Sequence, residues 1–289
     1  MLTILISTRN RPEFLKRLLD YFKSVNCPYP ILVGDASDNQ QGYIDCRGLH
    51  YGATIKKLLE QVHTPYVIQC PDDDFIIPEN LARCVEFLEN RYDYVAAHGK
   101  GLVLSLNDKV AISTYKQPVL ASGSPVGRLK AHLRHYSVGL FSVVRTVAAR
   151  KMLISINPIA DEALRGEILP GCLLAIQGKI KEFDFLTLVR QVHADRKVLA
   201  KEPDLTSYYT FIITVARELT PIDNIDFLGS EELIKNLYWE YRDRDTSLIE
   251  KMQRRFNQVK LADLLNPRHK FHKDFMPVYK SLLGVDLGQ

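Results

Sequence analysis

The first hundred residues alternate short apolar runs with amphipathic stretches, and this alternation restricts the fold more than any other feature of the sequence. Residues 2–8, 30–34 and 65–70 are apolar runs that end in polar turns. Pro12 and Pro78 each open a stretch with helical periodicity, and proline suits the first turn of a helix. Strands that alternate with helices predict a parallel sheet covered by helices on both faces. Ligands bind beyond the carboxyl ends of such strands, so we expect a site in the loops that follow them.

The rest of the chain changes character twice. Its middle part predicts a mixture of elements, in the order 99–115 (hairpin), 128–135 (helix), 138–144 (strand), 161–177 (helix ending at Gly178) and 180–193 (strand). From Glu202 onward the pattern is amphipathic and helical, and no strand is expected there. We therefore divide the chain into an α/β domain over residues 1–200 and a helical C-terminal region over residues 201–289.

Composition narrows the class of protein. Apolar residues make up 46% of the 289 residues, charged residues make up 25%, and the net charge is +4. These values are ordinary for a globular enzyme that handles anionic substrates, and the charge is far below that of a dedicated nucleic-acid binder. The five cysteines lack any CxxC spacing, which argues against a disulfide framework and against a structural zinc site. We find no secretory signal and no apolar run of membrane-spanning length, so a cytoplasmic location is expected.

The most informative local motif is Asp72-Asp73-Asp74, which directly follows the apolar run of residues 65–70. Adjacent carboxylates repel one another unless a cation or solvent relieves the repulsion. Mg²⁺ and Mn²⁺ prefer such oxygen ligands and commonly bridge carboxylates to substrate phosphates. A solvated acidic turn that caps the helix starting near Pro78 is the structural alternative.

Three segments in order, ILISTRNRPEFLKRLLDYF, ILVGDASDN and TPYVIQCPDDDFIIPENLARCVEFL, resemble the start of a family 2-like glycosyltransferase of the bacterial surface-polysaccharide type. The resemblance implies a GT-A fold, a Rossmann-like mixed sheet flanked by helices. It also implies a nucleotide pocket and a DxD-type metal motif. The residues that it assigns to the nucleotide pocket are Thr8, Arg9 and Arg11 after the first strand, and Asp35 and Ser37 after the second.

The same resemblance assigns the acidic motif to the metal. Asp72 and Asp74 take the DxD positions and bind Mn²⁺ or Mg²⁺ together with the donor diphosphate. Alignment on Pro78 equates Asp73 and Asp74 with the last acidic pair of the family pattern. Asp74 is therefore the firmer metal ligand. Asp72 and Asp73 remain alternatives for the second ligand, and if Asp72 takes that position, Asp73 is expected to contact the nucleotide.

A second group of candidates lies about ninety residues further on. In inverting members of the family, a carboxylate on a helix takes the proton of the acceptor hydroxyl. By position, Glu162 is the first choice for this base, Asp161 is the second, and Glu167 could fill the same role. His193 corresponds to a third metal ligand, and Arg190 could neutralise the departing diphosphate. Acidic residues at a helix start are also expected from the helix dipole alone.

These features predict an inverting, metal-dependent glycosyltransferase. The expected donor is a nucleotide-diphosphate sugar, with a UDP-sugar favoured, and the expected acceptor is a glycan or a lipid-linked hydroxyl. A sugar-phosphate nucleotidylyltransferase is the second hypothesis. The segment STRNRPE argues against it, because it lacks the glycines that such enzymes usually need in the loop over the triphosphate.

A third hypothesis is a non-catalytic nucleotide-sugar-binding or scaffold protein. It would interact with its partner through the basic stretches KMQRRFNQVK and NPRHKFHK. These stretches could touch an anionic membrane surface, which would make the protein peripheral at the inner face of the membrane. They could equally be solvated helix faces packed on the main domain or on a second subunit, which leaves homo-oligomer formation open.

Overall fold

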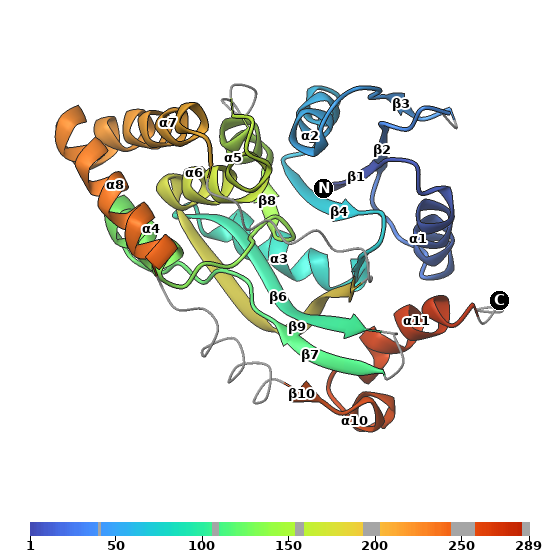
Figure 1. Ribbon diagram of the computed structural model, residues 1–289. Coiled ribbons are helices and arrows are strands. Elements are labelled where there is room, and N and C mark those ends of the chain that lie inside the picture. Colours follow the sequence, from blue (N-terminus) through green and yellow to red (C-terminus); the bar gives the residue numbers. More distant parts are fainter. Residues whose placement is uncertain (40–41, 106–109, 154–158, 193–202, 244–257, 285–289) are drawn as a thin grey trace.

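The computed structural model describes residues 1–39, 42–105, 110–153, 159–192, 203–243 and 258–284, and is built around one ten-stranded mixed sheet (Figure 1). At its centre, β1 (Leu2–Thr8) runs parallel to β2 (Ile31–Asp35) on one side and to β4 (Tyr66–Pro71) on the other. The short β3 (Ile44–Asp45) extends this parallel part at the edge. The parallel arrangement predicted from the first hundred residues is therefore confirmed.

Beyond β4 the sheet becomes mixed. β8 (Val143–Arg145) is antiparallel to both β4 and β6 (Tyr94–Ser105). β6 pairs in parallel with β9 (Lys179–Val192) and forms the predicted hairpin with β7 (Ala111–Tyr115). The two-residue strands β5 (Phe75–Ile76) and β10 (Gln258–Val259) add to β9 and β7.

The strand predicted over residues 138–144 is largely wrong. Only Val143 and Val144 of that segment pair with neighbouring strands. Val138 and Phe141 instead line a cavity described below. An apolar run can be buried by a cavity wall as well as by a sheet, and apolarity alone does not distinguish the two.

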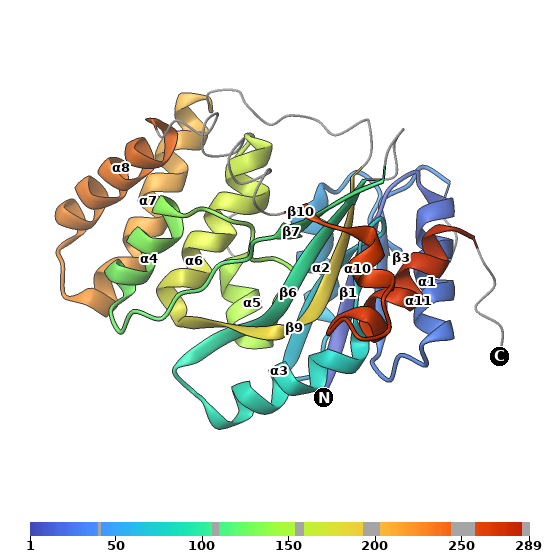
Figure 2. The same ribbon diagram turned by 90° about the horizontal axis from the view of Figure 1, so that it is seen from below.

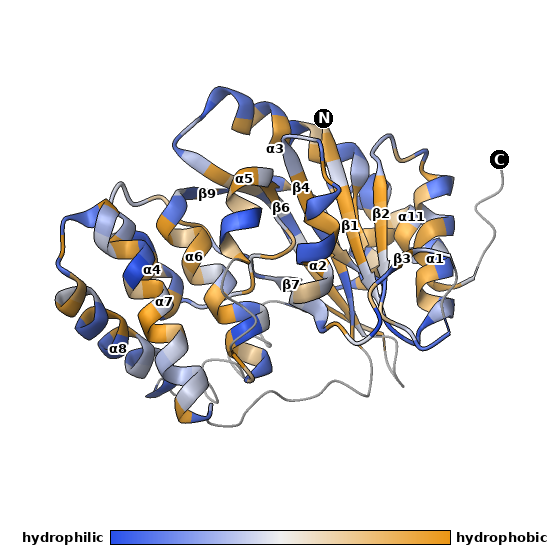
Figure 3. Ribbon diagram, turned by 90° about the horizontal axis from the view of Figure 1, so that it is seen from above, coloured by the Kyte–Doolittle hydropathy of each residue, from blue (hydrophilic) through white to orange (hydrophobic). Residues whose placement is uncertain are grey.

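Helices cover both faces of the sheet (Figure 2). One face carries α1 (Pro12–Ser24), α3 (Pro78–Asn90), α10 (Leu261–Leu265) and α11 (His272–Leu282). The other carries α2 (Tyr51–Glu60), α4 (Pro125–Arg134), α5 (Thr146–Met152), α6 (Leu169–Gln177), α7 (Leu205–Asp223) and α8 (Phe227–Asp243). The central strand serves both layers because its side chains alternate, with Ile4 and Ile6 on the α1 side and Leu5 on the α2 side. Figure 3 shows β1 and β2 as the most continuously hydrophobic strands.

The helix predicted over residues 161–177 contains a π-helical turn, η1 (Leu164–Ile168), directly before α6. The N–H of Leu169 donates to the carbonyl of Leu164, five residues back. Pro170 gives the physical reason, because it has no N–H to donate four residues back and its ring would clash with the carbonyl of Gly166. A wider turn relieves both problems, and π turns are frequent at functional sites.

Gly178 ends this helix for a different reason from the one predicted. Its φ of 173° is extended rather than left-handed. A Cβ at this position would lie 2.6 Å from Cγ1 of Val95, so glycine is required by close packing on β6.

The C-terminal region is helical as expected, except for β10, which pairs with β7 and shows that the expectation of no strand was wrong. The region packs in two places. α7 and α8 lie together against α6 and α4, whereas α11 returns to the opposite face and contacts α1 and β9. The division at residue 200 stays a prediction. Within the described ranges, no helix is long and apolar enough to span a bilayer.

Candidate active site

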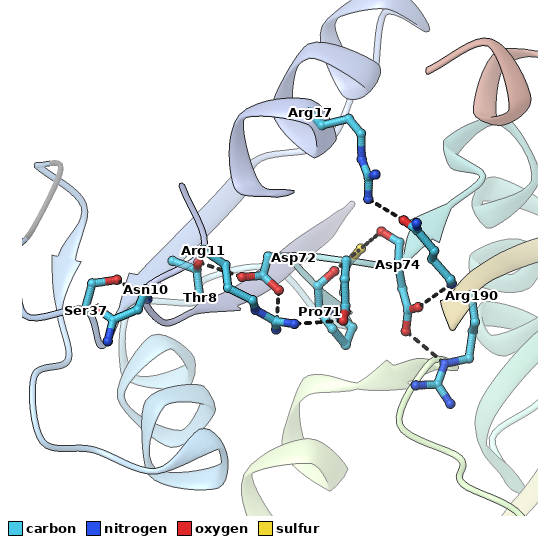
Figure 4. A network of polar contacts seen from close by, with 12 residues as sticks. Thr8, Asn10, Arg11, Arg17, Ser37, Pro71, Asp72, Asp74 and Arg190 are labelled. Carbon is cyan, nitrogen blue, oxygen red and sulfur yellow. Dashed lines mark hydrogen bonds and ion pairs between the residues drawn. The ribbon is translucent and has the colours of Figure 1, made fainter. Parts of the chain in front are cut away.

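Three neighbouring parallel strands end side by side, and the polar side chains that follow them are bonded to one another (Figure 4). Thr8 Oγ1, at the end of β1, donates to Oδ2 of Asp72 at 2.7 Å. Asp35, at the end of β2, accepts from the N–H of Ser37 at 2.8 Å, and Ser37 Oγ accepts from the N–H of Asn10 at 2.7 Å. Hydrogen bonds therefore connect the loops after β1, β2 and β4, and the assignment of these loops to a nucleotide pocket stays a prediction.

Two arginines neutralise the acidic segment. Arg11 places its Nη2 2.5 Å from Oδ1 of Asp72 and its Nη1 2.9 Å from Oδ2 of Asp73. Asp74 accepts from Nε of Arg190 at 2.9 Å and from the N–H of Gln191 at 3.0 Å. The guanidinium of Arg190 also lies over the rings of Tyr115 and Phe141, at 4.9 and 4.7 Å from their centroids. Sequence reasoning placed these residues at strand ends, but it did not foresee that arginines would bind the carboxylates.

Burial controls the charges of this segment. Asp72 and Asp74 are each 1% exposed, and burial raises the pKa of each to about 6, although Arg11 opposes the rise at Asp72 and Arg190 opposes it at Asp74. Burial also works against the charge of Arg190, but Asp74 and Tyr115 more than offset it, so that the pKa of Arg190 lies above its usual value. The arginines are therefore what keeps these buried carboxylates in their anionic form.

A cavity of about 370 Å³ adjoins the acidic segment. It lies between the start of α2, the end of β4, the loop before β8 and the η1 turn. Val138, Leu140 and Phe141 give it an apolar wall. Its charged and titratable lining consists of Arg9, His50, Tyr51, Glu162, Arg165, Glu167 and Arg190. Since Arg190 also binds Asp74, the cavity and the acidic segment form one continuous site.

The predicted catalytic carboxylates have different surroundings in the structure. Glu162 is exposed and lines the cavity. Asp161 instead caps its own helix, because its Oδ1 accepts from the N–H of Leu164 at 2.7 Å. Glu167 lines the cavity and is half-buried. Of the other predicted residues, Arg9 lines the cavity, whereas His193 lies outside the described residues.

His50, Tyr51 and Arg165 were missed. His50 accepts from the N–H of Ala53 at 3.2 Å and so caps α2, which directs its ring towards the cavity. Burial lowers the pKa of His50, the positive charge of Arg165 lowers it further, and Glu162 opposes them. Neither the capping role of His50 nor the meeting of α2 with η1 could be read from the sequence, because histidine is not a preferred N-cap and the meeting depends on tertiary packing.

The acidic segment can be tested for its fit to a divalent cation. In the ranges that the structure describes, no group of three or more His, Cys, Asp or Glu side chains is arranged around a metal position. Asp72 and Asp73 nevertheless offer oxygen ligands, and their shared partner Arg11 has a side chain that is 41% exposed and has solvent to move into. One or two carboxylates together with substrate phosphates are a common Mg²⁺ environment, so the segment fits such an ion once Arg11 is displaced.

The mixed sheet with helices on both faces matches the fold of solved TarS structures, and the predicted GT-A fold is confirmed. Among solved structures, the chain is similar to the glycosyltransferase TarS of S. aureus. With TarS 1-349 in complex with UDP-GlcNAc, the TM-score is 0.55 at 13% identity, over 97% of this chain and 81% of that one.

Two further TarS structures extend the comparison. With the complex of TarS 1-349 and UDP, the TM-score is 0.50 at 15% identity, over 91% and 76% of the two chains. With the longer TarS chain, the TM-score is 0.53 at 13% identity, and the match covers 98% of this chain but only 50% of TarS, so this chain spans half its length. No family model and no curated protein matches the sequence. At such low identity, the likeness establishes the fold alone.

Proposed function

We propose that the protein is a glycosyltransferase that moves a sugar from a nucleotide-diphosphate sugar to a hydroxyl group of an acceptor. The observation that carries this proposal is the continuity of the Asp72–Asp74 segment with the cavity that contains Arg190. The site lies in a fold shared with TarS, which has been crystallised with UDP-GlcNAc and with UDP. The UDP complexes support the choice of a UDP-sugar as donor.

The donor then lies across the ends of three strands. The nucleoside packs against the loops after β1 and β2, where Arg9, Asp35 and Ser37 provide polar groups. The diphosphate lies at the acidic segment, and the sugar enters the cavity beside Arg190. Arg190 stays charged at neutral pH and can stabilise the negative charge that develops on the departing diphosphate.

A divalent ion, Mn²⁺ or Mg²⁺, is part of this proposal. Asp74, with Asp72 or Asp73, would hold it; this needs Arg11 to release Asp72 and Asp73 and Arg190 to turn from Oδ2 of Asp74 towards the diphosphate. When bound, such an ion supplies Lewis-acid stabilisation of the leaving group. The exposed position of Arg11 supports this exchange, because a solvated side chain can move without disturbing the core.

Transfer is proposed to proceed by a single displacement with inversion at the sugar's anomeric carbon. A carboxylate of the 162–167 segment takes the acceptor proton, and Glu162 and Glu167 both line the cavity. The acceptor is a glycan or a lipid-linked hydroxyl compound. Contact with a membrane through residues 251–260 and 266–273 and self-association are parts of the proposal that need their own tests.

Nucleotide binding tests the function. Calorimetry with UDP, GDP, CDP and dTDP, each with and without Mn²⁺, should find one nucleotide that binds tightly with the metal. Asp74→Asn should weaken this binding by at least about tenfold, because the variant loses the carboxylate charge that attracts the metal. A tenfold change corresponds to about 1.4 kcal/mol of binding free energy. Asp184→Asn, at an exposed carboxylate that binds Lys270, is the matched control and should bind like the wild type.

Each alternative result has a definite meaning. Tight binding that does not require a metal would keep a nucleotide-sugar protein and remove the metal from the proposal. If none of the four nucleotides binds under either condition, the glycosyltransferase proposal is wrong.

A further inference from the structure

The π turn changes which side chains of its helix share a face. In a regular α-helix, two residues five positions apart differ by about 140° around the axis, since each residue turns the helix by about 100°. The η1 turn contains a hydrogen bond that spans five residues, which changes this angular spacing within Leu164–Ile168. Glu162, two residues before the turn, and Arg165, Gly166 and Glu167 within it all line the same cavity.

Glu167 is half-buried, which makes it the less exposed of the two carboxylates that line the cavity. The hydroxyl of Tyr136 is 3.5 Å from Oε2 of Glu167, at the outer limit of a hydrogen bond. Burial raises the pKa values of Tyr51, Tyr115 and Tyr136, and the Glu167 charge adds to the rise at each. Tyr136 is therefore a contact partner of Glu167, and Tyr115, whose pKa the Glu167 charge affects, packs against Arg190.

Glu162 is the more exposed of the two carboxylates. Its side chain is exposed, and its charge acts on His50 at the start of α2. A general base is most effective where water is excluded and where it lies beside the reacting carbon. Glu167 is half-buried and lines the cavity together with Arg190, which binds Asp74. Exposure and the contact with Tyr136 therefore distinguish Glu167 from Glu162.

We infer that Glu167, and not Glu162, is the catalytic base of the sugar transfer, with Tyr136 as the residue that positions its carboxylate. This inference rests on the proposed function. In the transfer, the acceptor oxygen forms a bond to the anomeric carbon of the donor sugar while its proton passes to the carboxylate of Glu167. The bond from that carbon to the diphosphate oxygen breaks, and its electron pair leaves with the nucleoside diphosphate beside Arg190.

Two isosteric variants separate the candidates. Glu167→Gln and Glu162→Gln remove the same charge from the same helix, five residues apart. With UDP-GlcNAc as donor and water as acceptor, UDP release measures turnover, and calorimetry measures donor binding. Glu167→Gln should lower kcat by at least about 100-fold, as expected for loss of a general base. Its Kd for UDP should stay within about twofold of the wild type, and Glu162→Gln should keep kcat within about threefold.

Two further readouts exclude a purely structural effect. Since Asp72 and Asp74 also take up protons at acidic pH, the acid limb of the pH–kcat profile should become less steep in Glu167→Gln and should keep its wild-type slope in Glu162→Gln. Glu167→Asp should recover part of the rate together with that slope. If Glu167→Gln keeps wild-type turnover, or if Glu162→Gln is the variant that loses it, the inference is overturned while the proposed function stands. If the wild type binds no nucleotide, the proposed function is wrong, and the inference, which rests on it, is wrong as well.

Discussion

Arg165 and Glu162 bring opposite charges to the same imidazole, that of His50 at the start of α2. Neither residue is near His50 in the sequence, and the meeting of the three depends on how η1 packs beside α2. The resemblance to family 2-like glycosyltransferases indicated Thr8, Arg11 and Asp74, and these residues lie near one another because the carboxyl ends of parallel strands meet at one edge. Sequence reasoning could not find their partners, because any nearby cation can neutralise a carboxylate and the choice is made by tertiary packing.

The electrostatics of the cavity can be measured at His50. A nearby positive charge disfavours the imidazolium ion, so Arg165→Met should raise the pKa of His50, whereas Glu162→Gln should lower it. Titration of the imidazole resonances by NMR gives both values directly. Arg47→Met removes an exposed arginine that binds Asp45 and should leave the pKa unchanged. Shifts of the wrong sign, or equal shifts in all three variants, would contradict the packing of η1 beside α2.

Helix α11 shows how an element near the end of the chain supports the beginning of the fold. Phe275 is fully buried with residues of α1, α3 and β9, and Asp274 accepts from Nδ2 of Asn80 on α3 at 2.9 Å. The helical periodicity of this segment could be read from the sequence. Its packing partner could not, because an amphipathic pattern indicates which face is buried and not what buries it. The π turn escaped prediction for a related reason, although Pro170 in the middle of a predicted helix was an available sign.

The contribution of α11 can be measured by truncating its buried ring. Phe275→Ala should lower the free energy of unfolding by about 3–5 kcal/mol, because a fully buried aromatic side chain is replaced by a void. Denaturant unfolding followed by circular dichroism gives this value. Tyr92→Ala, at a ring that is 86% exposed, should change it by no more than about 0.5 kcal/mol. A loss below about 1 kcal/mol in Phe275→Ala would show that α11 is not part of the core.

At the scale of the whole molecule, the two layers of helices share a single sheet, and the C-terminal region contributes to both. Phe211, Val215 and Leu237 of α7 and α8 belong to one apolar cluster, and Leu264 and Phe275 belong to the other. The alternating pattern of the first hundred residues was sufficient to predict the parallel centre, and the resemblance to family 2-like glycosyltransferases implied the GT-A fold. In the other half of the sheet, the hairpin of β6 and β7 was predicted because it is local, whereas the pairing of β8 with β4 and of β6 with β9 is non-local and is not encoded by local periodicity.

This arrangement predicts how the protein unfolds. If residues 201–289 complete the core, the full chain should unfold in one calorimetric transition whose van't Hoff and calorimetric enthalpies agree. A fragment of residues 1–203 should lack a cooperative transition, since the apolar faces of α4 and α6 that meet α7 and α8 would be exposed to water. Two resolved transitions in the full chain, or a fragment that unfolds cooperatively, would instead support two independent domains divided near residue 200.

The η1 turn also has a consequence for how this chain is compared with others. A π turn is equivalent to an α-helix with one residue inserted, so a homologue with a regular helix here would be one residue shorter. An alignment without a gap between residues 164 and 168 would pair the carboxylates on one side of the turn with the wrong positions. Such a comparison would place Glu167 one position out of register, although the fold itself had not changed. In this part of the protein, equivalent residues of two homologues must therefore be identified by superposing their backbones rather than by aligning their sequences.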